Sequence, residues 1–238
     1  GPKVAAAFAA GQAYVDDVPM RRADGSRFWA HLRGRPVDAA NSTAGTIWTV
    51  TDVTAEVTAR AQLEWTANHD MLTGLANRKA LEHRLTRSFD AQPASLPAAL
   101  VMIDLDRFKP VNDAAGHAAG DAMLQAVAGV LRARVRSRDL AVRLGGDEFA
   151  LLLDHCPLDA ALVLAEDVRA AIAGIELAWG EHRLGVGASL GVAALAPEMP
   201  DVAAWLHAAD EACYAAQAAG RDTVRAAAAR PVLRVVRG

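Results

Sequence analysis

The feature that most constrains the fold is the alternation of short apolar runs with amphipathic helical segments from His69 onward. One of these runs, Ala98 to Leu105, is apolar at every position except Asp104, which is typical of a strand buried at the centre of a sheet. Helical spacing of apolar residues occurs on both sides of that run. Strands that alternate with helices predict an α/β fold, in which helices cover a central sheet.

Helices are predicted where apolar residues recur every three or four positions, and strands where short apolar runs end at turn residues. Asn77 is a suitable N-cap for a helix whose apolar stripe is Leu81, Leu85 and Phe89. The other predicted helices cover residues 55–67, 120–135, 157–172 and 202–219. The predicted strands cover residues 27–35, 45–53, 98–105, 140–144, 149–153, 182–194 and 223–227, with turns at 24–25 and 41–45 and a loop at 93–97.

The same pattern divides the chain into three parts. Residues 3 to about 53 are strand-rich and too short for a stable sheet domain by themselves. Thr54 is a suitable N-cap for a connecting helix that carries Val57, Ala61 and Trp65 at helical spacing. We therefore expect a partial strand-rich domain over 1–53, a linker helix over 54–68 and the α/β domain over 69–238.

Composition excludes several classes of partner. The 25 Lys and Arg residues nearly balance the 28 Asp and Glu residues, and aromatic residues make up 5% of the chain. Neither a basic surface for a nucleic-acid backbone nor a stacking platform for single strands is therefore expected. Cys156 and Cys213 have no metal-ligand spacing and are predicted to be free thiols in a reducing compartment.

These features predict a cytoplasmic domain. No apolar run reaches the ~20 residues that a membrane-spanning helix needs. The opening pair Gly1-Pro2 is typical of a protease-cleavage remnant, so we expect the natural protein to extend further upstream. Membrane attachment through those upstream regions stays open.

Two acidic clusters follow predicted strands. Asp104-Leu105-Asp106 ends the central strand, and the segment 145–148 (GGDE) forms the tip of a predicted hairpin. Taken singly, the first is explained as a surface strand end and the second as a hairpin turn with solvated acids. Taken together, their carboxylates could converge on a pair of hard divalent cations, which prefer oxygen ligands.

Five motifs, in order along the chain, resemble those of the GGDEF-domain diguanylate cyclases. The central motif is 143–149 (RLGGDEF), which is similar to the sequence that gives this family its name. The resemblance covers about residues 66 to 228, and five motifs in register are far more specific than one. The other four are Asp70 to Arg78 (DMLTGLANR), Asp104 to Asp113 (DLDRFKPVND), Gly116 to Asp121 (GHAAGD), and Ala209-Asp210 with Tyr214 and Gly220-Arg221.

The resemblance implies a palm-like βαββαβ core, with a largely antiparallel central sheet of about five strands flanked by helices. It implies a diguanylate cyclase, which condenses two GTP molecules into cyclic di-GMP and releases two pyrophosphates. Asp104, Asp147 and the carbonyl of Leu105 would hold two Mg²⁺ ions. Asp147 or Glu148 would help to deprotonate the attacking 3′-hydroxyl, and Asp106 would support the site indirectly.

The resemblance also assigns the substrate contacts, some to the triphosphate and some to the guanine base. A carboxylate suits guanine because it can accept hydrogen bonds from both N1–H and the N2 amino group. Two of these positions have ordinary alternatives: Arg221 as a cation that follows a helix C-terminal glycine, and Asp121 as an acid in the first turn of a helix. Lys109 and Arg221 would contact the triphosphate, backbone groups at Phe108, Lys109, Gly145 and Gly146 would approach it, and Asn112 and Asp121 would read the base.

Arg136 and Asp139 form an Arg-x-x-Asp pattern shortly before Gly145, which resembles the family's inhibitory site for its own product. An arginine fork suits cyclic di-GMP, with Asp139 accepting from guanine, and the alternative is a surface ion pair. One position departs from the family pattern, because Gln217 stands where a lysine is usual. We therefore expect reduced or ordinary activity rather than none.

The N-terminal strands resemble the last strands of a PAS sensor domain, and Thr51 to Thr54 is similar to its exit into a signalling helix. One site holds one GTP and the product is two-fold symmetric, so we expect a homodimer with product inhibition. The expected partners are GTP, cyclic di-GMP and a second copy, with no nucleic-acid polymer. The alternative is a degenerate GGDEF domain that binds GTP or cyclic di-GMP without turnover, which Gln217 favours.

Overall fold

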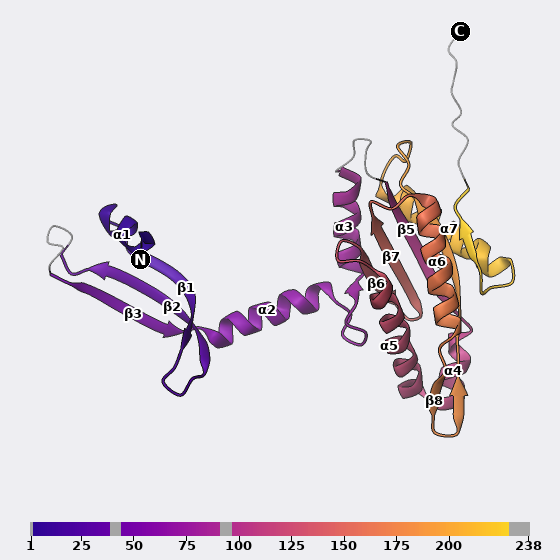
Figure 1. Cartoon of the computed structure of the whole chain (residues 1–238), viewed down its shortest axis with the longest axis horizontal. Coiled ribbons are helices and arrows are strands. Elements are labelled where there is room, and N and C mark those ends of the chain that lie inside the picture. The colour runs from indigo at the N-terminus through magenta and orange to yellow at the C-terminus, as the bar shows by residue number, and fades with distance from the viewer. Residues whose placement is uncertain (1, 39–43, 91–96, 229–238) are drawn as a thin grey trace, which may run out of the picture. The chain divides into compact units, whose positions relative to one another are not determined.

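A computed structural model describes residues 2–38, 44–90 and 97–228 of the chain. The chain splits into two compact units, residues 1–65 and 66–238, coloured from indigo to yellow along the sequence (Figure 1). The boundary falls inside the segment that the sequence predicts as a linker helix. Most of the predicted turn at 41–45 and of the predicted loop at 93–97 lies outside the described residues.

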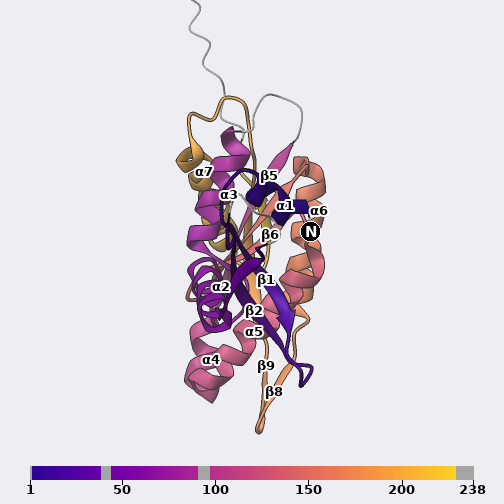
Figure 2. The ribbon, with the colours of Figure 1, turned by 90° about the vertical axis from the view of Figure 1, so that its left-hand side faces the viewer.

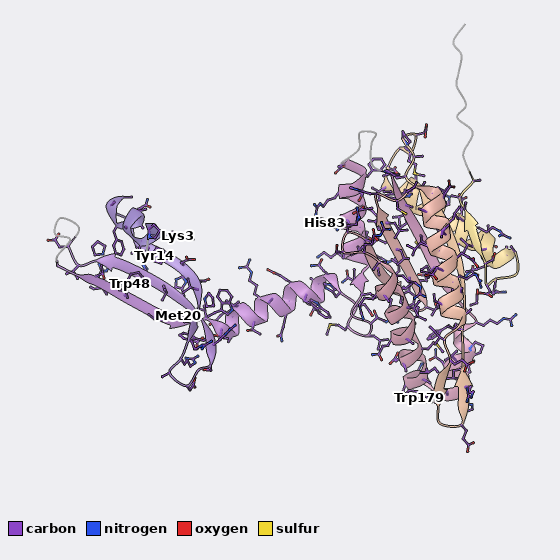
Figure 3. The ribbon with its side chains drawn as sticks, viewed as in Figure 1. Lys3, Tyr14, Met20, Trp48, His83 and Trp179 are labelled. Carbon is purple, nitrogen blue, oxygen red and sulfur yellow. The ribbon has the colours of Figure 1, made fainter. Side chains whose placement is uncertain are left out.

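The first unit is a three-stranded antiparallel sheet with a short helix. The Trp48 ring lies edge-on to Tyr14 and against Phe8, which joins helix to sheet; Tyr14 and Trp48 are labelled in Figure 3. The helix was not predicted; its alanine-rich sequence favours helix, and proline is well tolerated at a first helical position. The elements are α1 (Pro2–Ala9), β1 (Tyr14–Arg21), β2 (Arg27–Pro36) and β3 (Thr46–Asp52), in the sheet order β1-β2-β3.

Helix α2 (Thr54–Asn68) follows β3. Its start differs in detail from the prediction, because the Asp52 carboxylate accepts from the Thr54 backbone N–H (3.0 Å) and hydroxyl (2.6 Å). The Thr54 hydroxyl oxygen in turn accepts from the backbone N–H of Trp29 (2.9 Å). The side-chain acceptor at the start of α2 is therefore Asp52, and Thr54 is the first helical residue rather than the N-cap.

The second unit contains a six-stranded sheet in the order β11-β10-β5-β7-β6-β4. The four central strands pair antiparallel, and the two edge strands pair parallel to their neighbours. The prediction of about five strands missed the two-residue β4, which is too short to carry a periodic signal. The strands are β4 (Ala76–Asn77), β5 (Ala98–Asp106), β6 (Leu140–Gly145), β7 (Glu148–Asp154), β10 (Gly187–Ala194) and β11 (Val224–Ala226).

Helices cover both faces of this sheet, which gives the predicted α/β architecture (Figures 1 and 2). One apolar cluster joins α5 and α6 to one face of the sheet, and a second joins α3 and α7 to the other. Alternate residues of β5 serve the two clusters, because successive side chains of a strand point to opposite faces. The helices are α3 (Arg78–Asp90), α4 (Phe108–Ala115), α5 (His117–Arg134), α6 (Leu158–Ala173) and α7 (Val202–Ala218).

The predicted capping of α3 is present, since the Asn77 side chain accepts from the Ala80 backbone N–H (3.1 Å). The chain order β5, α4, α5, β6, β7, α6, β10 gives the expected βαββαβ core. Among the helices of the described ranges, none combines the length and apolarity needed to cross a membrane.

Two predicted boundaries were wrong in this unit. The sequence places one helix after Gly120, but α4 lies inside the DRFKPVND stretch and α5 already begins at His117. Pro110 does not interrupt α4 because it stands in the first turn, where its missing N–H costs no helical hydrogen bond. The predicted strand 182–194 is also divided: β9 (His182–Leu184) forms a separate hairpin with β8 (Leu177–Trp179), apart from β10.

Candidate active site

The two predicted acidic clusters come together at one end of the β5–β7 pair. Asp104 on β5 lies opposite Glu148 on β7 in the antiparallel register. The backbone N–H of Leu105 donates to the carbonyl of Asp147 (3.2 Å), so the turn that carries Asp147 lies beside β5. Residues more than forty positions apart in sequence are thus neighbours because β5 and β7 are adjacent strands.

The carboxyl group of Asp104 is held in an unfavourable environment for a lone negative charge. Partial burial raises its pKa to about 6, and repulsion from Asp147, and to a lesser degree from Glu148, adds to the effect. A hydrogen bond from Gln217 on α7 acts in the opposite direction on this pKa. A cation at this point would relieve the repulsion among the acids.

The donor set fits a hard divalent ion that also binds a nucleotide. Among the described residues, no group of three or more His, Cys, Asp or Glu side chains is placed to enclose a metal. Mg²⁺ is commonly held by one or two carboxylates with waters and substrate phosphates completing the shell. Asp104, Asp147 and nearby backbone carbonyls such as that of Leu105 match this open kind of site.

The glycine turn between β6 and β7 is fixed by an arginine clamp. Gly145 and Gly146 both have positive φ, which L side chains rarely adopt. Arg143 donates from Nε (3.1 Å) and Nη2 (2.8 Å) to the carbonyl of Gly146, and from Nη1 to both carboxylate oxygens of Asp70 (3.1 and 3.2 Å). Asp70 also accepts from Thr73.

Asp70 and Arg143 received no individual role from the sequence, although both belong to the quoted motifs. The hydrogen bonds from Thr73 and Arg143 hold the pKa of the Asp70 carboxyl below its usual value, against the opposing effect of partial burial. Their pairing spans 73 positions, so only the fold brings them together. The clamp sets the position of the turn that carries Asp147 and Glu148.

Helix α4 begins beside this acidic end of the sheet. The residue before it, Arg107, has a left-handed backbone (φ 56°), and its side chain does not cap the helix. The first N–H groups of α4, at Phe108 and Lys109, therefore face no side-chain acceptor from the cap, which suits a phosphate. Phe108 is buried, whereas Lys109 is exposed.

The two predicted base-reading residues come from neighbouring helices. Asn112 on α4 lies against Gly120 on α5: a Cβ added at Gly120 would meet the Asn112 Oδ1 at 1.9 Å and the Phe108 ring at 3.2 Å. Asp121 directly follows that glycine and is exposed. Glycine at 120 therefore leaves the space that the Asn112 amide occupies, beside Asp121.

Comparisons with known proteins agree with this geometry. A family model described as "Diguanylate cyclase, GGDEF domain" matches residues 67–223, about two thirds of the chain. The chain belongs to the GGDEF domain family of diguanylate cyclases. The predicted family resemblance is confirmed by this match, which covers the second unit almost entirely.

The chain is similar to several proteins named as diguanylate cyclases. The chain is 37% identical over 214 residues to the probable diguanylate cyclase DgcE of Escherichia coli, covering 89% of this chain and 19% of that protein. It is 43% identical over 171 residues to diguanylate cyclase TpbB of Pseudomonas aeruginosa, covering 70% of this chain and 39% of that protein. The chain thus spans well under half the length of these relatives.

A solved structure shows the same fold. The coiled coil and GGDEF domain of DgcB from Caulobacter crescentus, in complex with c-di-GMP, superposes with a TM-score of 0.68 at 30% sequence identity. The match covers 73% of this chain and 95% of that chain. The mixed α/β architecture predicted from the sequence is therefore confirmed.

The predicted inhibitory residues of the GGDEF domain lie in a turn before β6. The Asp139 carboxylate accepts from the backbone N–H of Arg136 (3.0 Å) and of Asp154 (3.2 Å), while Arg136 is exposed. Arg84 on α3 fastens the same turn, because it donates to the Arg138 carbonyl (2.6 Å) and pairs with Asp154. Each oxygen of Asp139 can accept a further hydrogen bond.

The remaining predicted cation of the GGDEF domain, Arg221, lies in the loop after α7. Its Nε is 3.8 Å from the Asp106 carboxylate, and its side chain is half exposed. Gln217 lies one helical turn earlier in the chain. Its neutral amide donates a hydrogen bond to Asp104, whereas a lysine at this position would carry a positive charge. The structure thus places Lys109, Arg221 and Gln217 on elements that border the acidic strand ends, namely α4, the 219–223 loop and α7.

Proposed function

We propose that this chain is a diguanylate cyclase that condenses two GTP molecules into cyclic di-GMP and two pyrophosphates, dependent on Mg²⁺. The observation that carries the proposal is the convergence of Asp104 and the Asp147 turn beside the uncapped start of α4. An acidic metal site next to a phosphate-binding helix start is what phosphoryl chemistry on a nucleotide requires.

The metal-binding role falls to Asp104, Asp147 and the Leu105 carbonyl. Two Mg²⁺ ions held there would polarise the α-phosphate and make the attacking 3′-hydroxyl easier to deprotonate. Asp147 or Glu148 accepts the proton of that hydroxyl. The O3′–Pα bond forms while the bond from Pα to the pyrophosphate oxygen breaks.

The substrate-binding roles divide between phosphate and base. Lys109 and Arg221 neutralise the triphosphate, and the N–H groups at the start of α4, with the backbone at Gly145 and Gly146, lie close to it. Asn112 and Asp121 select guanine, because adenine lacks the paired donors N1–H and N2 that the Asp121 carboxylate can accept.

Two copies of the domain are needed for one product. The product is two-fold symmetric, and each site supplies one nucleotide, so two sites must face each other in a homodimer. We place the reaction in the cytoplasm, where GTP is available. Binding of cyclic di-GMP at Arg136 and Asp139 then inhibits the enzyme.

The first unit and α2 are proposed as a regulatory segment. The strands of residues 1–53 correspond to the end of a PAS-type sensor domain, and the helix over 54–68 links that domain to the catalytic domain over 69–238. The antiparallel sheet and the helix that directly follows β3 support this division.

The direct test is to incubate the purified chain with GTP and Mg²⁺ and to separate the products by chromatography. Cyclic di-GMP and pyrophosphate are expected, and Asp147→Ala should lower their formation at least about a hundredfold, because it removes a metal ligand. Asp159→Ala, an exposed acid on α6, is the matched control and should leave the rate unchanged. Turnover that survives Asp147→Ala would reject the metal assignment.

The alternative, a GGDEF domain that binds without turnover, is favoured by Gln217 alone. Calorimetry with GTP and with cyclic di-GMP distinguishes the two proposals. Binding of either nucleotide in the absence of any product in the chromatographic assay would establish the alternative and overturn the first proposal.

A further inference from the structure

Asp106 is the one charged side chain that is buried among the described residues, at 8% exposure. It ends β5, two positions beyond Asp104. Its Oδ1 accepts from the Ser189 hydroxyl (2.8 Å), and its Oδ2 accepts from the backbone N–H of Asp222 (2.9 Å). Burial of a carboxylate is costly unless hydrogen bonds satisfy it, and here both oxygens are engaged.

The register explains why the serine serves Asp106 rather than Asp104. Ser189 on β10 stands directly opposite Asp104 on β5, and Gly187 stands opposite Asp106. These side chains share one face of the sheet, because residues two apart on a strand point the same way. Nevertheless the Ser189 hydroxyl reaches diagonally to Asp106, which leaves Asp104 directed toward Gln217 and the acids of the β6–β7 turn.

The loop that Asp106 holds has an unusual backbone. Arg221 and Asp222 are consecutive residues with positive φ, 69° and 43°. This conformation is unfavourable for residues with side chains and persists only where the surroundings impose it. Two contacts do so: Asp106 binds the Asp222 backbone, and Arg169 on α6 donates to the Asp222 carboxylate (2.7 Å).

We propose that Asp106 is a positioning residue, which fixes the 220–222 loop on the end of β5 so that Arg221 is directed to the triphosphate of a bound nucleotide. The inference rests on the proposed function of the site. Its main element is the hydrogen bond to the Asp222 backbone, since the Arg221 side chain is half exposed and its Nε lies 3.8 Å from the Asp106 carboxylate. Asp106 thereby acts on phosphate binding and is not itself a metal ligand.

The primary test is Asp106→Ala, with nucleotide affinity and metal affinity measured separately. Calorimetry with 3′-deoxy-GTP, which lacks the attacking hydroxyl and cannot condense, should show binding weakened about tenfold, the size expected for one misplaced cation. The affinity for Mn²⁺ without nucleotide should fall by no more than about threefold, because Asp106 acts on Asp104 only through its charge, which solvent partly screens. Arg225→Ala, an exposed arginine on β11, is the charge control and should change neither value.

A second variant approaches the same hydrogen bond from the loop. Asp222→Pro removes the donor N–H and cannot adopt a φ of 43°, yet it alters an exposed position outside the core, so it remains informative if Asp106→Ala does not fold. It should weaken 3′-deoxy-GTP binding about as much as Arg221→Ala does. Asp222→Asn, which keeps the N–H and tolerates positive φ, should bind nearly as well as the unaltered protein.

The outcomes separate this inference from the proposed function. Loss of Mn²⁺ affinity in Asp106→Ala, to the level of Asp104→Ala, would make Asp106 a metal ligand and overturn the inference. Unchanged 3′-deoxy-GTP binding in Asp222→Pro would overturn it as well. Absence of turnover in the unaltered chain would reject the cyclase proposal but leave these binding measurements as a valid test.

Discussion

The two units of this chain bury their apolar side chains to very different degrees. In the described part of the first unit, Ala30 is the one hydrophobic side chain that is fully buried, while Trp29, Trp48 and Val50 are 38–53% exposed. The second unit contains two buried clusters, one on each face of its sheet. The second unit therefore has a hydrophobic core of its own, whereas the described part of the first unit is a sheet whose apolar side chains are mostly partly exposed.

The two units also differ in the environment that each provides for an acidic side chain. The Asp52 carboxylate in the first unit is stabilised by hydrogen bonds from Thr54 and Arg22, which lower its pKa to about 2. The Asp104 carboxylate in the second unit is disfavoured by burial and by Asp147, which raise its pKa to about 6. Acids that are stabilised by hydrogen bonds support structure, whereas acids that are partly buried and repel one another are typical of a functional site.

The largest expected effect tests the difference between the cores. Trp205 is fully buried, and its indole N–H donates to the Ala193 carbonyl (2.9 Å). Trp205→Ala should lower the free energy of unfolding of the second unit by about 3–5 kcal/mol, as for other large buried side chains. The matched change Trp48→Ala should cost less than about 1.5 kcal/mol, because that ring is 41% exposed.

Urea unfolding followed by circular dichroism measures both values. Equal losses of stability in the two variants would contradict the contrast between the units.

The next effect concerns the space beside Asn112. In Gly120→Ala the added methyl group would occupy the position of the Asn112 Oδ1, so the amide must move away. We expect a KM for GTP about tenfold higher and weaker discrimination against ATP, because a displaced base-reading group loses its hydrogen bonds. Gly129→Ala, in open space on the same helix, is the control.

Initial rates with GTP and ATP provide the measurement for both glycine variants. A Gly120→Ala enzyme with unaltered kinetics would show that Asn112 does not read the base.

A third effect follows from the opposite pKa shifts of Asp104 in the second unit and Asp52 in the first. Because the folded pKa of Asp104 is raised, its contribution to stability is full below pH 4 and is lost as the pH rises through about 6. Bound Mg²⁺ requires the ionised form, so added Mg²⁺ should stabilise the protein more at pH 7.5 than at pH 5. We expect a difference of roughly 1 kcal/mol, after allowance for partial solvent screening.

Thermal melting with and without Mg²⁺ at the two pH values detects this difference. Asp104→Asn should abolish it, whereas Asp52→Asn should not. An Mg²⁺ effect that is independent of pH would argue against Asp104 as a ligand. The depressed pKa of Asp52 acts in the other direction, since its contribution is lost as the pH falls below 4.

The smallest expected effect concerns Gln217. Gln217→Lys replaces a neutral amide beside Asp104 with a cation, which should both attract the triphosphate and favour the ionised acid. We expect a KM for GTP about threefold lower, because a partly exposed charge is screened by solvent. Gln217→Met, neutral and similar in size, should not lower KM, and a fall in that variant would exclude a charge effect.

Much of the fold was predictable because its signals are local. The buried run 98–105, the Asn77 cap and the apolar stripe of α3 each lie within a few turns or one strand, and the structure has these elements. Errors arose where the local signal is weak or misleading. The two residues of β4 are identified only by their pairing with β6 and with His69, which no local pattern of the sequence indicates. Pro110 made a helix over 108–115 difficult to predict.

The sequence by itself determined the alternation of strands and helices, and the motif residues that identify the family. The tertiary structure alone decided which of them meet: Arg143 with Asp70, Asn112 with Gly120, and Asp106 with Ser189 and the Asp222 backbone. The physical reason is that hydrogen bonding within helices and strands is set by near neighbours. Contacts between distant positions depend on strand order and register, which only the packed sheet specifies.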